Sequence, residues 1–209
     1  MSLCRSLFYF LCVITFLSTL TVLFGAYWLW EIKTSGELIL DHAPSAVTIM
    51  READTQIIHV SGEDWHAIAY GQGFASAQNR LWQMEKQRRM AKGELAEIFG
   101  KDVILVDKFM RNVGLHRISK EGIENHLSKE DIDLLQAYAD GVNDYVQGLS
   151  LTDSEKTTGR FLPPEFVAFG ITKESYKKWE ILDSLVTCKL INLNLTWNWG
   201  ADLQKETLR

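Results

Sequence analysis

The clearest periodic pattern of the chain lies in residues 71–100, where apolar positions recur at alternating spacings of three and four. On a helix these positions share one face. The stripe is formed by Phe74, Ala77, Leu81, Met84, Arg88, Ala91 and Leu95. Six of these residues are apolar, so the pattern predicts a helix packed against protein, with Arg88 as a structural buried charge.

The position of Arg88 leaves two alternatives open. A buried guanidinium needs a carboxylate and further acceptors, because an unpaired buried charge costs several kcal/mol. Alternatively, Arg88 lies beyond the edge of the core and extends its charged end into water. Gly71 and Gly73 precede the stripe and indicate close approach of another backbone.

Upstream of this helix, residues 46–52 and 56–60 read as two short strands, and residues 53–55 form the turn of a hairpin. Residues 61–64, Ser-Gly-Glu-Asp, resemble a capping box in which Ser61 accepts and Asp64 reaches back. The long helix should then end near Met90 or Ala91, where Gly93 follows.

Downstream, residues 102–126 read as helical but weakly patterned. Ser128 and Asp131 form a second cap, before a patterned helix that ends near Gly148. Residues 149–160 read as a polar loop, and the prolines at 163 and 164 begin a short helical piece. From Asp183 the chain reads as helix to its end.

The first thirty residues form an apolar segment, since residues 7–30 carry no charge. As a helix they would be about 36 Å long, enough to cross a hydrocarbon layer of about 30 Å. The apolar segment ends with the aromatic residues Tyr27, Trp28 and Trp30, as membrane-spanning helices often do at the membrane surface. This ending favours an uncleaved signal anchor over a cleaved signal peptide. We therefore predict one transmembrane helix at 1–30, a linker at 31–45 and the main region at 46–209.

Flanking charge predicts the orientation of this anchor. Arg5 precedes the span and Glu31 follows it, which favours a cytosolic N-terminus and a lumenal or extracellular main region. The sequon Asn194-Leu195-Thr196 suits that side as a glycosylation site at Asn194. Secretion after signal cleavage is the alternative.

Composition narrows the function by exclusion. The formal net charge is −5, from 22 basic and 27 acidic residues, so a nucleic-acid partner is not expected. No HExxH, CxxC pair or Asp-rich calcium loop appears, which argues against a self-contained metal site. The lone Cys188 is interpreted as a buried structural thiol.

Several motifs in order then resemble the α-chain signature of the penicillin amidase (penicillin acylase) family. The long helix contains "AQNRLWQM", followed by Arg88-Arg89 and "GELAEIFG". The further matches are "VTIMRE" upstream, and "YADGVNDYV", "LPPEFVAFG" and "WEILDSL" downstream. Together they cover about residues 45–209.

The resemblance implies an α+β, mostly helical region that is the α-chain part of an αββα N-terminal-nucleophile hydrolase. In such amidases an α-chain precedes a spacer and a β-chain, and the β-chain begins with the catalytic residue, usually Ser. The α-amino group of that residue serves as base. No catalytic residue is matched here, so the expected function is the α-chain or a fragment of a hydrolase of linear amides. Three alternatives remain: a non-catalytic membrane-anchored remnant, an interaction module, or an incomplete gene product.

The resemblance also implies site residues. The last α-chain helix lines the acyl pocket, here near Asn192, Leu195 and Thr196, whereas Trp197 and Trp199 are interpreted as packing residues. Asp202 matches a carboxylate that helps to bind structural calcium, although a solvated helix residue is the alternative. The implied partners are a β-chain, which would also supply the acid for Arg88, and a small-molecule amide in the complete enzyme.

Overall fold

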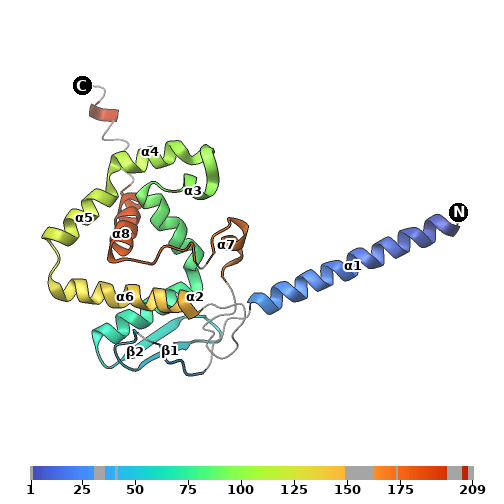
Figure 1. Ribbon diagram of the computed structural model, residues 1–209, viewed down its shortest axis with the longest axis horizontal. Helices are drawn as coiled ribbons and strands as arrows, with labels where there is room; N and C mark the ends of the chain where they lie inside the picture. The colour runs from blue at the N-terminus through green and yellow to red at the C-terminus, as the bar shows by residue number, and fades with distance from the viewer. Residues whose placement is uncertain are drawn as a thin grey trace. The chain divides into compact units, whose positions relative to one another are not determined.

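The structure is a computed structural model that describes residues 2–30, 36–40, 42–148, 162–172, 174–196 and 204–206 (Figure 1). Within α1 the side chains of residues 2–8, 24 and 26–30 lie outside the description. The chain divides into two units, Met1–Leu38 with Gly148–Phe161, and Ile39–Gln147 with Leu162–Arg209. Each unit is considered by itself below.

The first unit contains α1 (Ser2–Trp30), so the helix predicted at residues 7–30 is confirmed. Its hydroxyl side chains bond back along the helix; Thr19 Oγ1 donates to the Thr15 carbonyl at 2.6 Å. Within the described residues, no helix is both long and apolar enough to cross a membrane. The structure therefore gives the predicted membrane anchor no support, and the predicted localisation and orientation stay predictions.

The second unit begins with an antiparallel hairpin of β1 (Val47–Arg51) and β2 (Ile58–Gly62), which pairs Val47 with Gly62 and Arg51 with Ile58. The hairpin prediction is confirmed, but its second strand starts two residues later than predicted. The turn extends through Gln56, which has a φ of 59°. That left-handed conformation does not continue into a strand.

Helix α2 (Trp65–Lys92) follows the hairpin. The predicted capping box at residues 61–64 is wrong, because Ser61 belongs to β2 and Asp64 is the N-cap. The Asp64 carboxylate accepts from the backbone N–H of Ala67 at 2.8 Å. Gly93 ends the helix as predicted, with a φ of 71° and its N–H directed at the carbonyls of Arg89 and Met90.

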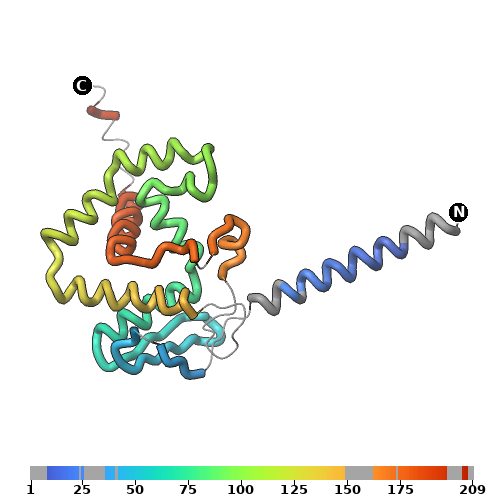
Figure 2. Tube along the Cα trace, in the orientation of Figure 1, coloured from blue at the N-terminus to red at the C-terminus, as the bar shows by residue number. Residues whose placement is uncertain are grey.

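Helix α6 (Lys129–Gly148) crosses α2 at very short range (Figure 2). A Cβ added at Gly73 would collide with the Tyr138 carbonyl oxygen, and one added at Gly141 would collide with the Tyr70 carbonyl oxygen. Gly73 therefore confirms the predicted close backbone approach, whereas Gly71 instead faces the side chains of Val47 and Val60.

The predicted cap of α6 is also confirmed. The backbone N–H of Ser128 donates to Asp131 Oδ2 at 3.1 Å, and the backbone N–H of Asp131 donates to Ser128 Oγ at 3.1 Å.

The helical structure predicted for residues 102–126 is confirmed. The segment contains the 3-10 turn η1 (Gly100–Val103), α4 (Ile104–Val113) and α5 (Leu115–Asn125), and α3 (Ala96–Phe99) precedes it. Gly114 separates α4 from α5 with a φ of 78°, which a continuous α-helix cannot contain.

The last long helix, α8 (Ile181–Leu195), packs against α2 and α5 (Figure 1). The short helix α7 (Pro164–Ala168) precedes it and begins with proline as predicted. The core between these helices contains Ala91, Met110, Leu115, Val186 and Leu190.

A continuous helix from Asp183 to the chain end is not observed. Glu180 and Asp183 form a capping box, so α8 begins at Ile181, and Thr196 leaves the helix with a ψ of 74°. The described part of the chain is thus mostly helical with one two-stranded sheet, as predicted.

Candidate functional site

Arg88 lies on the buried face of α2, as its place in the apolar stripe predicts. Its side chain is 4% exposed, and its Nε donates to Glu85 Oε2 at 2.7 Å. Its Nη1 donates to Asp183 Oδ2 of α8 at 3.1 Å, and its Nη2 donates to the Lys177 carbonyl at 2.6 Å. Of the two alternatives for Arg88, the buried and paired one is correct.

Aromatic rings complete the surroundings of this guanidinium. Its central carbon lies 4.8 Å from the ring centroid of Tyr176 and 5.4 Å from that of Trp179. Burial alone lowers the pKa of Arg88, but its electrostatic interactions with Tyr176, Glu85 and Asp183 outweigh burial and raise this pKa above its ordinary value. The side chain is therefore a permanent cation.

Three further charges extend this buried cluster. Arg89 Nε donates to Glu85 Oε1 at 2.6 Å and its Nη1 donates to Glu97 Oε2 at 2.6 Å, while Lys92 Nζ lies 2.5 Å from Asp183 Oδ1. Burial tends to raise the pKa of Glu97, but its hydrogen bond with Arg89 and the charge of Lys177 lower it overall. The positive charges of Arg88, Arg89 and Lys92 are thus balanced by the negative charges of Glu85, Glu97 and Asp183.

This balance corrects one expectation. The acids that pair with Arg88 are Glu85 and Asp183 of this chain, so the expectation that a β-chain supplies the acid is wrong. Arg88 is therefore a structural charge that joins α2 to α8. The sequence carried a signal for the local half of this network, since Glu85, Arg88 and Arg89 have the i, i+3 and i+4 spacings of helix ion pairs.

A groove of about 610 Å³ runs between α2, α6 and α8. Asn192, one of the predicted pocket residues, lies in its wall. Leu195 and Thr196 do not line it; they are exposed at the end of α8. The groove is lined by Ala69, Gln72, Ser76, Arg80, Gln83, Met84, Gln87, Leu134, Leu135, Tyr138, Trp179, Ser184, Thr187, Cys188, Ile191 and Asn192.

Two other predictions concern this helix. Cys188 is an exposed thiol in the groove wall, so its interpretation as a buried structural residue is wrong. Asn194 is exposed in the last turn of α8, and its glycosylation stays a prediction.

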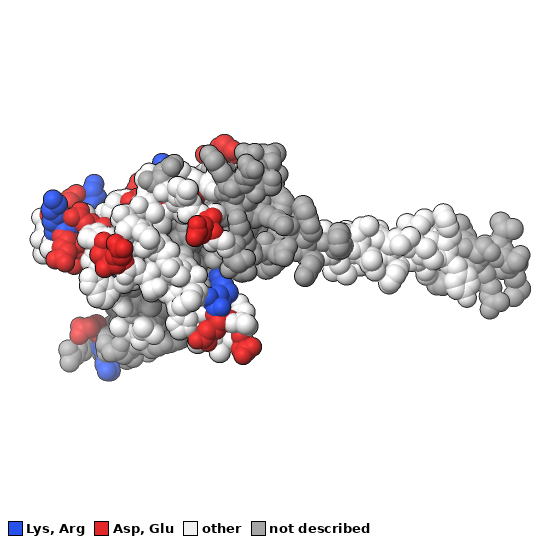
Figure 3. Space-filling view, turned by 90° about the horizontal axis from the view of Figure 1, so that it is seen from below, with Lys and Arg blue, Asp and Glu red and all other residues white. Residues whose placement is uncertain are grey.

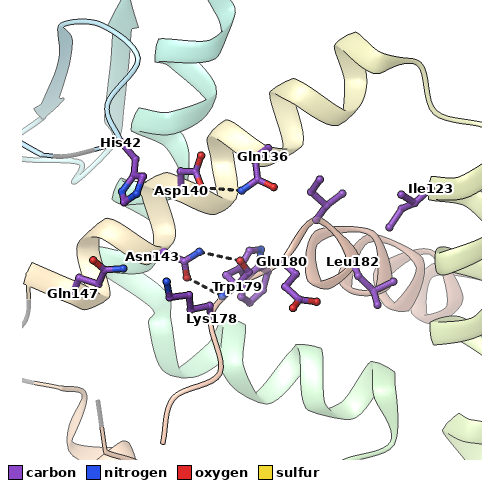
Figure 4. A pocket seen from close by; sticks show the side chains of 11 residues that line it. His42, Ile123, Gln136, Asp140, Asn143, Gln147, Lys178, Trp179, Glu180 and Leu182 are labelled. Atoms are coloured by element: carbon purple, nitrogen blue, oxygen red, sulfur yellow. Dashed lines mark hydrogen bonds between the residues drawn. The ribbon is translucent and has the colours of Figure 1, made fainter. Parts of the chain in front are cut away.

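A second pocket, of about 480 Å³, lies beside His42 (Figure 4). The imidazole Nδ1 is 2.6 Å from Asp144 Oδ1, and Tyr70 Oη donates to Asp144 Oδ2 at 2.6 Å. On the other side of the pocket, the Asn143 side chain donates to the Trp179 carbonyl and accepts from the Trp179 N–H, at 2.9 and 2.8 Å (Figure 4). These bonds fasten the segment before β1 and the segment before α8 to α6.

The predicted calcium ligand cannot be placed, because Asp202 lies outside the described residues, as do Trp197 and Trp199. Among the described residues, no group of three or more His, Cys, Asp or Glu side chains is arranged to hold a metal ion. On the face drawn in Figure 3, acidic and basic side chains are intermixed.

The sequence profile of the family described as penicillin amidase matches residues 46–209. The chain belongs to the penicillin amidase family.

Individual relatives agree with this assignment. Penicillin G acylase from Escherichia coli is 36% identical over 146 residues, which are 69% of this chain and 16% of that protein. Penicillin acylase 2 proenzyme from Pseudomonas sp. (strain SE83) is 33% identical over 147 residues, 69% of this chain and 17% of the relative. Acyl-homoserine lactone acylase QuiP from Pseudomonas fluorescens is 29% identical over 173 residues, 83% of this chain and 19% of the relative. The chain therefore spans about a sixth of the length of these curated relatives.

The fold agrees as well. The structure of thermostable penicillin G acylase from Alcaligenes faecalis superposes with a TM-score of 0.59 at 26% sequence identity. The match covers 76% of this chain and 75% of that chain. The mostly helical fold with a small sheet is thus shared with a penicillin acylase.

Proposed function

We propose that this chain supplies the α-chain portion of a penicillin-amidase-type hydrolase that cleaves the C–N bond of linear amides. The observation that carries the proposal is the family match over residues 46–209 together with the shared fold. In this proposal the nucleophile and the second half of the αββα core come from a β-portion, and the 209 residues position that portion.

The names of the relatives support a substrate class. They are acylases of penicillin and of acyl-homoserine lactones. Penicillin G and these lactones both carry an acyl group joined to nitrogen through an amide. We therefore expect a linear amide with a hydrophobic acyl group as the substrate of the complete enzyme.

An exposed apolar face supports the need for a partner polypeptide. Leu105 is 77% exposed and Phe109 is 45% exposed, one helical turn apart on α4, although α4 buries Asp107 and Met110 on its other side. Apolar side chains exposed together mark interaction sites on otherwise folded surfaces.

The test is complementation. The full chain is co-expressed with the C-terminal portion of Escherichia coli penicillin G acylase that follows the matched segment, and hydrolysis of a chromogenic N-acyl anilide is measured. We expect turnover only when both parts are present, and none when the partner's N-terminal serine is replaced by alanine. Absence of turnover by both parts together would favour a non-catalytic remnant or interaction module.

Calcium belongs to this proposal only as an implied structural ion. Asp202 would offer one carboxylate oxygen, and the remaining ligands would come from the partner portion, because calcium takes six to eight oxygen ligands. If this is correct, calcium raises the Tm of the two-part complex, and Asp202→Asn removes that increase. The matched control is Asp133→Asn, an exposed carboxylate of α6.

A further inference from the structure

The groove between α2, α6 and α8 is long enough to bind a polypeptide segment. Along α2 its lining extends from Ala69 to Gln87, which is about 27 Å of helix at about 1.5 Å per residue. Its lining combines the apolar side chains of Met84, Leu134 and Leu135 with uncharged amides and hydroxyls. Such a lining suits a helix that presents apolar and uncharged polar residues.

The charge of the groove is concentrated at one residue. Arg80 is the one charged residue among those that line it. Its side chain is exposed, and it has no hydrogen bond or ion pair with the part of the chain that the structure describes. The buried cations of α2 differ, since Arg88 and Arg89 are both paired with carboxylates.

Two further features mark the same place. The backbone of α2 leaves helical geometry at Arg80, with a φ of −141° and a ψ of 26°. Thr187 Oγ1, on the facing helix α8, is buried without a hydrogen-bond partner. A buried hydroxyl without a hydrogen-bond partner is destabilising, because it has lost its bonds with water.

We propose that this groove seats a helix of the β-portion, which pairs a carboxylate with Arg80 and offers a polar group to Thr187. The inference rests on the proposed function and names where and how the two parts meet. The size of the relatives favours this occupant, because more than four-fifths of each curated relative lies outside the matched segment.

Charge argues against a second copy of the same groove. A symmetric dimer brings identical surfaces together, and this surface contains no carboxylate. Both copies of Arg80 would then remain unpaired in the interface. A short free carboxylate could reach Arg80, but it would leave most of the groove's length empty.

Cys188 provides a probe in the groove wall, and Cys12, exposed on α1, provides an internal reference. The full chain is labelled with a maleimide, alone and after co-expression with the C-terminal portion of Escherichia coli penicillin G acylase, and labelling of each cysteine is read by peptide mass spectrometry. We expect Cys188 labelling to slow by about tenfold in the complex, while Cys12 is unchanged. A tenfold slower rate corresponds to a free-energy difference of about 1.4 kcal/mol between the bound and free states of the groove.

Arg80→Glu should restore Cys188 labelling to within about twofold of the free chain, since it places a like charge against the proposed carboxylate. The matched variant Lys86→Glu lies on α2 outside the groove lining and should leave Cys188 protected. Protection that survives Arg80→Glu would overturn the proposal. So would protection that rises with the concentration of the chain alone, or protection by benzoate alone.

Hydrolysis measured on the same samples separates the two proposals. If the complex hydrolyses the anilide while Cys188 stays unprotected, the proposed docking of a helix in the groove is refuted and the proposed function is retained. Protection without turnover would keep the docking and refute the function. Absence of both would refute both.

Discussion

Arg88 Nη1 lies 3.1 Å from Asp183 Oδ2, although 95 residues separate the two in sequence. This bond ties α2 to α8 at a point where both side chains are almost fully buried. The position of α8 relative to α2 therefore depends on a charge pair, and α8 in turn forms one wall of the groove.

Replacement of Arg88 by methionine should destabilise the chain by about 3–5 kcal/mol, because it leaves Glu85 and Asp183 short of a buried cation. Chemical unfolding of the full chain, followed by circular dichroism, measures this loss. Arg117→Met, an exposed arginine of α5, should change the free energy of unfolding by less than about 0.5 kcal/mol. Equal effects of the two substitutions would show that the buried cluster contributes no special stability.

A double-mutant cycle isolates the pair itself. Arg88→Met combined with Asp183→Asn should be less harmful than the sum of the single changes by more than about 1 kcal/mol. Additivity within about 0.5 kcal/mol would mean that the 3.1 Å contact carries no coupling energy.

Gly73→Ala should destabilise the crossing of α2 and α6 by about 3 kcal/mol, because the new Cβ meets the backbone carbonyl of Tyr138. A backbone atom cannot move aside as a flexible side chain can. Gly122→Ala is the matched control: its Cβ would meet nothing within 4 Å on α5, so it should stabilise the chain by about 0.5–1 kcal/mol. Thermal unfolding of both variants would contradict this packing if Gly73→Ala were neutral.

Sequence reasoning located these features to different degrees. The 3,4 spacing identified the buried face of α2, including Arg88, because helical periodicity is local information. Asp183 was recognised as part of the "WEILDSL" motif but not as the partner of Arg88, because a contact across 95 residues leaves no local spacing. The motif order was enough to identify the family, which residues 46–209 match.

The errors at helix boundaries have physical causes as well. Ser61 and Asp64 both resemble caps in sequence, and pairing of Ser61 with Thr48 in the hairpin decided between them. The sequence predicted helical structure on both sides of Gly114 but not the break itself, because a single glycine occurs within helices as well as at their ends. The bonds of His42 with Asp144 join segments 102 residues apart, which no local pattern records.

His42→Ala should loosen the segment before β1. The imidazole is half-exposed but bonds a buried carboxylate, so its loss should cost about 1–2 kcal/mol and increase amide hydrogen exchange in residues 42–46. His59→Ala is the control, because His59 pairs with Glu52 at 2.8 Å where both side chains are largely exposed. Its effect should stay below about 0.5 kcal/mol. Unchanged exchange in the His42 variant would show that the bond does not hold the segment.

Alkaline pH should weaken the fold through its buried tyrosines. Burial raises the pKa of Tyr145 from 10.0 to about 12, and burial also raises the pKa of Tyr138 and Tyr176. Because the unfolded chain releases these protons first, the stability that neutral Tyr145 contributes is complete below pH 10 and is lost as the pH rises towards 12.

Tyr145→Phe tests this sign, since it keeps a ring against Phe74 but removes the ionisable group. The free energy of unfolding of this variant should fall less steeply between pH 10 and 12, by up to about 1.4 kcal/mol per pH unit. Tyr9→Phe, on the exposed surface of α1, should leave the slope unchanged. An identical slope in wild type and Tyr145→Phe would contradict the assignment.

The central proposal is that residues 46–209 position a reactive group that lies in the β-portion of the complete enzyme. The most direct measurement is the rate of N-acyl anilide hydrolysis by the purified full chain, with and without the C-terminal portion of Escherichia coli penicillin G acylase. The account predicts turnover with that portion and a rate at the uncatalysed background without it. Hydrolysis by the chain alone, above that background and in proportion to its concentration, would contradict the account.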